Sequence, residues 1–171
     1  MERVNAVLKH PEFCNRLRKI AELERDRVFC GHGLEHMLDV ARIAYIQSLE
    51  IGNREFKWGI KGASNPGVIK ELIYAAALLH DIGRARQYED GTPHEQESAR
   101  IAAKILPECR FDENETSLIL DAILSHRAKS DGEIEGFAGL MCRADMLSRR
   151  CYDCAVSKDC KWETKNTLLE Y

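Results

Sequence analysis

Residues 68–84, VIKELIYAAALLHDIGR, form the most apolar helical segment of the chain. The apolar residues recur at helical spacing, which predicts a buried central helix over residues 68–80 that is closed by Gly83. The segment ends on the adjacent pair His80 and Asp81. A buried carboxylate without a partner is costly, so Asp81 in this position favours a compensating group such as a bound metal ion.

Helical spacing continues on both sides of this segment. We predict further helices over residues 11–27, 33–50, 94–106, 112–126 and 136–149, separated by a loop at 51–67 and a turn at 89–93. Asp112 followed by Glu115 three residues later is a capping-box pattern at a helix start. No repeat and no convincing strand pattern is found. The predicted fold class is therefore all-α, a single helical bundle over residues 1–171 in which 150–171 is a cysteine-rich C-terminal tail.

The composition is that of one ordinary globular domain with a real hydrophobic core. The formal net charge of -3 argues against the basic surface that binds long nucleic acids, although a small anion needs only a few local cations. No apolar run approaches the roughly 20 residues that span a bilayer, and the N-terminus lacks the pattern of a secretory signal. We therefore expect a cytoplasmic protein whose partners include no membrane and no long nucleic acid.

Histidines and aspartates lie at the ends and on the inner faces of the predicted helices. His94 shares a helical face with Ser98, Ile101 and Ile105, and His126 shares one with apolar residues of its own helix. Taken singly, each histidine is better explained as a core or capping residue with a hydrogen bond. Taken together, inward-facing ligands on several helices are how bundles build sites for divalent transition metals. The candidate ligands are His36, His80, Asp81, His94, His126 and Asp145.

Three local contexts carry a family resemblance. His36 is followed by Val40 four residues later, residues 78–84 are LLHDIGR, and residues 144–147 are ADML. In this order the segments resemble the HD-domain superfamily of metal-dependent phosphohydrolases, over about residues 30–150. The resemblance implies a helical bundle of the HD-domain type. It also implies that one metal ion is held by His36, His80, Asp81 and Asp145.

The chain is also similar to the branch of this superfamily that binds two metal ions. In that branch His94 and His126 would help to hold the second ion, with Asp81 as the bridge between the two. The implied cofactors are one or two divalent ions. Iron or manganese is favoured, with nickel, cobalt or zinc as alternatives.

The resemblance implies hydrolysis of a phosphoester or phosphoanhydride bond, because a bound divalent ion brings the pKa of its water toward neutrality. Asp81 and Asp145 are the catalytic candidates, which would orient the attacking water. Arg84 is the candidate for a phosphate oxygen, with a solvated surface arginine as the alternative. His32 is the candidate for a substrate contact, with capping of the helix start as its alternative. Further candidates for phosphate contact are Arg127 and Lys129.

The expected partner is a small phosphorylated substrate, with a nucleotide or dinucleotide polyphosphate favoured, and a homodimer is allowed for. The alternative function is a nucleotide- or metal-sensing HD domain without turnover. Domains of that kind lose one or more metal ligands. Because every ligand position is filled in this sequence, catalysis is the favoured function.

The seven cysteines suggest a separate site near the C-terminus. Cys142, Cys151, Cys154 and Cys160 lie within nineteen residues, and four thiolates can bind structural zinc or hold an iron–sulfur cluster. Cys142 is equally well explained as a small buried core residue. The third functional hypothesis is a redox or metal-storage protein centred on these cysteines, with the histidines as bystanders.

Overall fold

A computed structural model of the chain describes residues 1–51, 65–125, 136–162 and 165–169. These residues contain eight α-helices, two short 3-10 helices and no strand, so the predicted all-α fold class is confirmed. None of the helices described is both long and apolar enough to cross a membrane. The helices are α1 Glu2–Lys9, α2 Pro11–Leu23, α3 Leu34–Ile51, α4 Pro66–Leu79, α5 Arg84–Asp90, α6 His94–Glu108, α7 Glu113–Ser125 and α8 Gly136–Leu147, followed by η1 Cys151–Asp153 and η2 Ser157–Asp159.

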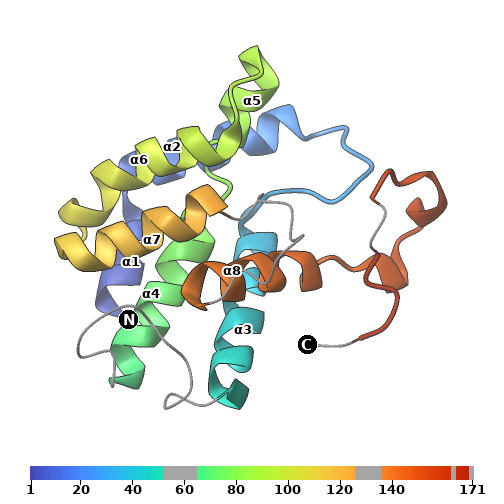
Figure 1. Ribbon diagram of the computed structural model, residues 1–171. Helices are drawn as coiled ribbons and strands as arrows, with labels where there is room; N and C mark the ends of the chain where they lie inside the picture. The colour runs from blue at the N-terminus through green and yellow to red at the C-terminus, as the bar shows by residue number, and fades with distance from the viewer. Residues whose placement is uncertain (52–64, 126–135, 163–164, 170–171) are drawn as a thin grey trace.

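Helix α4 is the centre of the bundle, as the apolar segment predicts. It begins at Pro66, where the side chain of Asn65 accepts a hydrogen bond from the Gly67 backbone and caps the helix. Its buried side chains pack against α1, α3, α6, α7 and α8. Figure 1 shows α4 between α1 and α3. The C-terminal end of α4 therefore delivers His80 and Asp81 into the interior.

Local sequence signals set the starts of α6 and α7. Asp112 and Glu115 exchange backbone-to-side-chain hydrogen bonds of 2.9 and 3.0 Å, so the predicted capping box is confirmed. Helix α6 begins at His94 and buries the face that its spacing predicts, with His94 and Ser98 fully shielded from solvent. The helix runs to Glu108, two residues beyond the predicted end.

Two short helices were not predicted. Helix α1 is held by Arg3, whose guanidinium bonds Glu71 of α4 at 2.7 Å and Glu115 of α7 at 2.5 Å. Helix α5 starts directly after Gly83 and ends at Asp90, where it is capped by Gly91 in a left-handed conformation with φ 80°. The eight residues of α1 and the seven of α5 are too short for periodicity to reveal.

Other helix ends differ from the predictions by a few residues. The helix predicted over 11–27 ends at Leu23, and the one predicted over 136–149 ends at Leu147. In the tail, the described residues beyond Lys161 are not helical. Instead, the side chain of Asn166 donates to the carbonyls of Leu147 and Arg149 and satisfies the C-terminal end of α8.

Candidate metal centre

Asp81 lies at the centre of the candidate site and is 1% exposed. Its two carboxylate oxygens face different groups. Oδ2 lies 3.5 Å from Nε2 of His36 and 3.3 Å from Nε2 of His80. Oδ1 lies 3.0 Å from Nε2 of His94 and 2.8 Å from Nε of Arg84. One buried carboxylate thus joins two adjacent sets of nitrogen atoms.

Asp145 completes the first of these sets. Its Oδ1 lies 3.4 Å from Nε2 of His36 and 3.8 Å from Nε2 of His80. One ligand atom each from His36, His80 and Asp145 lies within 4.8 Å of the others, which is close enough to share one ion. These residues come from α3, the end of α4 and α8, so three helices converge on this point.

His94 and Arg84 make up the second set, on the Oδ1 side of Asp81. His94 is fully buried at the first position of α6. The predicted ligand His126, together with Arg127 and Lys129, lies outside the described residues. Helix α7 ends at Ser125, directly before His126 in the sequence.

The imidazoles of His36, His80 and His94 are oriented in the same way toward Asp81. Each directs Nε2 at Asp81 and has a polar partner at Nδ1: Oγ of Ser148 at 3.3 Å for His36, the Ala77 carbonyl at 2.7 Å for His80, and Oε1 of Gln87 at 3.0 Å for His94. A partner on Nδ1 selects the tautomer that leaves the Nε2 lone pair for a metal ion. Gln87 and Ser148 were not singled out from the sequence. Ser148 lies one helical turn after Asp145, a spacing that could have revealed it, whereas nothing local marks Gln87.

The charges of the site show why a cation belongs there. Burial alone would lower the pKa of His80, but the carboxylates of Asp81 and Asp145 outweigh burial and raise this pKa to about 10. Burial likewise opposes ionisation of Asp81 and Asp145, yet the surrounding histidines hold both carboxyl pKa values well below their usual range. Without a metal ion, the site therefore retains a proton on His80 to balance the buried carboxylate of Asp81 and the partly buried one of Asp145.

The donor set fits a divalent transition ion. Nε2 of His36 is buried and, within the described part of the chain, makes no hydrogen bond, although two carboxylate oxygens lie 3.4 and 3.5 Å away. Histidine nitrogens mixed with carboxylate oxygens suit iron, manganese, cobalt, nickel or zinc. An ion among these atoms would replace the balancing proton and bind Nε2 of His36.

Gly83 lets the end of α4 approach the start of α6. A Cβ atom at this position would lie 2.5 Å from the carbonyl oxygen of His94 and 2.6 Å from the backbone nitrogen of Ser98. The Gly83 backbone also donates a 2.9 Å hydrogen bond to Oγ of Ser98. The contact sets the distance between Asp81 and His94, so the glycine is part of the architecture of the site.

His32 lies beside the centre, two residues before the start of α3. Its ring packs edge-on against that of His36, with centroids 5.9 Å apart. Nδ1 contacts the carboxylate of Glu24, and the hydroxyl of Tyr88 donates to the same carboxylate. Burial lowers the pKa of His32, an effect that Glu24 partly offsets. Glu24 and Tyr88 were not singled out from the sequence, and no local pattern marks them.

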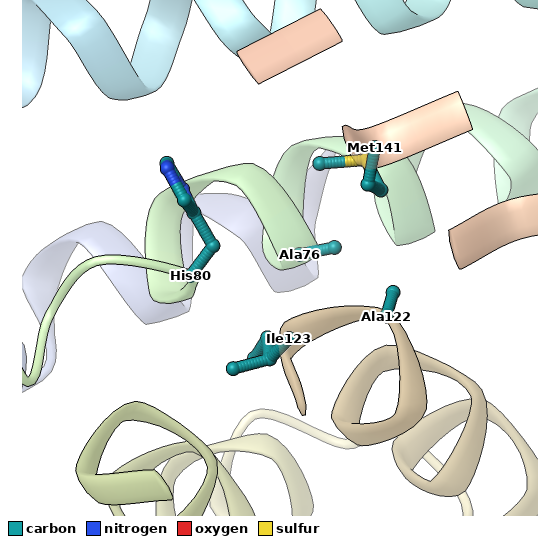
Figure 2. Close-up of a pocket in the computed structure, with 5 residues that line it drawn as sticks. All are labelled: Ala76, His80, Ala122, Ile123 and Met141. Atoms are coloured by element: carbon teal, nitrogen blue, oxygen red, sulfur yellow. The ribbon is translucent and has the colours of Figure 1, made fainter. Parts of the chain in front are cut away.

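Arg84 is close to the centre, where a phosphate contact was predicted. Its guanidinium also lies 3.2 Å from Oε1 of Gln87, so it is held by both Asp81 and Gln87. Next to His80 lies a narrow apolar recess, which is lined by this histidine and by Ala76, Ala122, Ile123 and Met141. Figure 2 shows the His80 imidazole pointing away from Ala122 and Ile123. The recess is too narrow to admit a water molecule, so it is core packing and not a substrate pocket.

These features define an all-helical domain with a buried histidine–aspartate metal centre. Residues 33–153 match the HD domain family, and the chain belongs to that family. It is similar to the crystal structure of a predicted HD superfamily hydrolase from an uncultured Thermotogales bacterium, with a TM-score of 0.51 and 26% identity over 86% of this chain and 74% of that one. Family, structural neighbour and donor set together support a metal-dependent hydrolase.

Curated relatives extend over most of the chain. An uncharacterized protein of Clostridium beijerinckii is 43% identical over 173 residues, which cover 100% of both chains. Ribonuclease Y of Enterococcus faecalis is 30% identical over 149 residues, and ribonuclease Y of Sulfurimonas denitrificans is 29% identical over 140 residues. These matches cover 85% and 81% of this chain but only 23% and 22% of the two ribonucleases.

Proposed function

We propose that this protein is a metal-dependent phosphohydrolase that cleaves a phosphoester or phosphoanhydride bond in a small, nucleotide-like substrate. The observation that carries the proposal is the placement of Asp81, whose two oxygens face two sets of nitrogen atoms. This placement supports a role for Asp81 in which each of its oxygens would help to hold a divalent ion. We further propose iron or manganese as the occupant, with His36, His80 and Asp145 holding one ion and His94 and His126 contributing to the second.

The residues of the chain would have the following roles. A bound divalent ion would lower the pKa of a bound water and would stabilise negative charge on the phosphoryl group. Asp81 and Asp145 accept hydrogen bonds and orient the attacking water. Arg84, now held by Asp81, can turn its guanidinium to a non-bridging phosphate oxygen, because the ions would take over its role beside the carboxylate. His32 donates from Nδ1 to Glu24, which leaves its other ring nitrogen as an acceptor for a water or a substrate hydroxyl.

The similarity to ribonuclease Y supports a second candidate substrate, the phosphodiester bond of RNA. Against a long RNA stands the net charge of -3, since RNA-binding surfaces are usually basic. A mononucleotide, a dinucleotide polyphosphate or a short oligonucleotide requires only local cations such as Arg84. A non-catalytic sensing domain is disfavoured because each described ligand position holds a residue suited to metal binding.

The test is a screen of phosphorylated metabolites, dinucleotide polyphosphates and short oligoribonucleotides. The purified chain is first stripped of metal and then reconstituted with iron, manganese, nickel or cobalt. We expect turnover of one substrate class, lost on chelation and restored by the metal. Absence of turnover with every class in fully loaded protein would overturn the proposal.

Variants make the test specific to the centre. His80→Ala and Asp81→Ala should abolish both metal content and turnover while helical content stays near that of the wild type. The matched control is His10→Gln, since His10 caps α2 and contacts Glu108 away from the centre. Retained turnover in either centre variant, or equal loss in the control, would contradict the assignment.

A further inference from the structure

His32 contacts two helices that carry residues of the histidine–aspartate centre. Toward α3, its ring packs edge-on against that of His36, with the ring centroids 5.9 Å apart. Toward α5, its Nδ1 lies 3.2 Å from the hydroxyl of Tyr88. Tyr88 follows Arg84 by about one helical turn, so the two side chains lie on the same face of α5. His32 is therefore close to a candidate metal ligand and to the helix face that carries the candidate phosphate contact.

The carboxylate of Glu24 holds His32 in this position. Glu24 is the C-cap residue of α2, and its Oε2 accepts a hydrogen bond from the backbone nitrogen of His32 at 2.8 Å. Its Oε1 contacts Nδ1 of the same histidine and accepts from the Tyr88 hydroxyl at 2.5 Å. Burial alone would raise the pKa of Glu24, but hydrogen bonds from His32 and Tyr88 outweigh burial and lower this pKa to about 2. Because an ionised carboxylate only accepts hydrogen bonds, Nδ1 of His32 carries a proton.

The other nitrogen of the His32 ring is a hydrogen-bond acceptor. With the proton on Nδ1, the neutral imidazole keeps a lone pair on Nε2. Only 9% of His32 is exposed, and its Nε2 makes no hydrogen bond with any residue that the structure describes. Among the described residues, the ligand atoms close enough to share one ion belong to His36, His80 and Asp145, and His32 is not in this group. Because a nearly buried polar atom needs a partner, Nε2 is placed to accept from a donor on the substrate.

The chemistry of a phosphorylated substrate limits what this donor is. An ionised phosphate offers only acceptor oxygens, so Nε2 of His32 does not bind the phosphate itself. In a nucleotide the donors nearest to the phosphate are the hydroxyls of the ribose, whereas the amino groups of the bases lie farther away. A nucleotide whose phosphate is held by Arg84 would therefore present a ribose hydroxyl on the side of His32.

We propose that His32 is a specificity-determining residue that accepts a hydrogen bond from a ribose hydroxyl, and that Glu24 and Tyr88 are the positioning residues that orient it. Since this role rests on the proposed phosphohydrolase function, it narrows the substrate of that function to nucleotides that carry a hydroxyl beside the phosphate. Glu24 acts from the end of α2 and Tyr88 from α5. Two helices that provide no candidate metal ligand thus gain a role in substrate recognition.

Calorimetric titration of the manganese-loaded protein tests the ribose contact. The probes are adenosine monophosphate, the two analogues that each lack one ribose hydroxyl, and inorganic phosphate. One of the analogues should bind about 3–10-fold more weakly to the wild type, which is the effect of one neutral hydrogen bond. His32→Ala and Glu24→Ala should lose this discrimination but bind inorganic phosphate as the wild type does, whereas the control Glu22→Ala, at an exposed position of α2, should keep it. Equal affinity of the wild type for all three nucleotides, or an equal loss of phosphate binding in Glu24→Ala, would overturn the proposal.

Turnover of the same nucleotides separates the role of His32 from the hydrolase function. Discrimination in binding without any turnover would contradict the hydrolase function alone. Turnover with equal kcat/KM for adenosine monophosphate and both analogues would contradict the role of His32 alone.

The proton on Nδ1 of His32 has a spectroscopic test of its own. In zinc-loaded protein with isotope-labelled histidine, nuclear magnetic resonance distinguishes a proton on Nδ1 from one on Nε2. We expect the wild type to carry it on Nδ1 and Glu24→Ala to show a mixture, with the His32 signals identified by their absence in His32→Ala. Tyr88→Phe should move these signals, and the control Glu89→Gln, which weakens an ion pair with Lys19 between exposed side chains, should not. A proton on Nε2 in the wild type would refute the proposal, also where Glu24→Ala does not fold.

Discussion

Among single residues, the side chains that form hydrogen bonds with the candidate metal ligands matter as much as the ligands themselves. Gln87 holds Nδ1 of His94 at 3.0 Å and also accepts from Arg84 at 3.2 Å, so one amide orients both groups on the Oδ1 side of Asp81. On the Oδ2 side of Asp81, Oγ of Ser148 lies 3.3 Å from Nδ1 of His36 and orients its ring. The same hydroxyl donates to the backbone carbonyl of Asp145 at 2.7 Å. The two halves of the centre thus have separate supporting residues, and each half can be weakened separately.

Gln87→Ala tests the second half of the centre. Without the amide oxygen, His94 loses the partner that orients its ring, and such changes typically weaken metal binding by about 10–100-fold. We expect one of two ions to bind about 10–100-fold more weakly while the other is unchanged, as measured by titration of the metal-free protein. Gln96→Ala, at an exposed position of α6 close to His94 in the sequence, is the control. If both ions weaken equally, or neither does, the two-ion arrangement is wrong.

Gly83→Ala tests the close contact between the ends of α4 and α6. The added Cβ would lie under 3 Å from backbone atoms of His94 and Ser98, so the first turn of α6 must move. Overpacking of this kind costs about 1–3 kcal/mol, and we expect the free energy of unfolding to fall by that amount together with metal affinity. The control is Gly33→Ala, where a Cβ meets no atom within 4 Å. Denaturant unfolding of both variants provides the comparison, and equal stability would contradict the role of Gly83.

At the scale of helices, α1 packs through its buried Val4 and Val7, and one arginine joins it by ion pairs to two other helices. Arg3 joins Glu71 of α4 to Glu115 of α7, and its guanidinium lies 4.4 Å from the ring centre of Phe111. Arg3→Met keeps much of the packing but leaves two partly buried carboxylates without their cation. We expect the free energy of unfolding to fall by about 2–3 kcal/mol. Arg110→Met removes an ion pair between exposed side chains and should leave the melting temperature unchanged. Similar losses in the two variants would show that Arg3 has no special role.

The same helices show what could be predicted from the sequence. Helix α7 was predicted with its capping box because that signal lies within four residues. Helix α1 was missed because its eight residues are too short for periodicity to reveal, and the ion-pair partners of its Arg3 lie 68 and 112 residues away. In the site, His36, His80 and Asp145 stand in local contexts that marked them, and the structure brings them together. Glu24 and Gln87 acquire their roles only through tertiary packing, which no local pattern encodes.

For the whole molecule, the buried charges couple stability to pH in the metal-free protein. The pKa of His80 is raised from 6.5 to about 10, so its contribution is complete below pH 6.5 and is lost as the pH rises toward 10. Asp81 and Asp145 have lowered pKa values, so their contribution is present above pH 3.8 and is lost as the pH falls below it. The metal-free chain should therefore be most stable between about pH 4 and 6.5.

Metal binding should abolish or reverse the loss of stability that the metal-free protein shows at alkaline pH. An ion at Nε2 of His80 displaces the proton, so at pH 8 binding should release protons, detectable as a heat of binding that varies with the ionisation enthalpy of the buffer. In excess chelator, raising the pH from 6 to 9 should lower the free energy of unfolding by about 3 kcal/mol, because the unfolded chain loses the His80 proton above pH 6.5 whereas the folded chain still binds it up to about pH 10. In saturating manganese the same change should leave stability equal or higher, because protons no longer compete with the ion. His80→Gln should remove the alkaline loss in chelator. If the chelated wild type is equally stable at pH 6 and 9, the proton on His80 is not what balances Asp81 and Asp145.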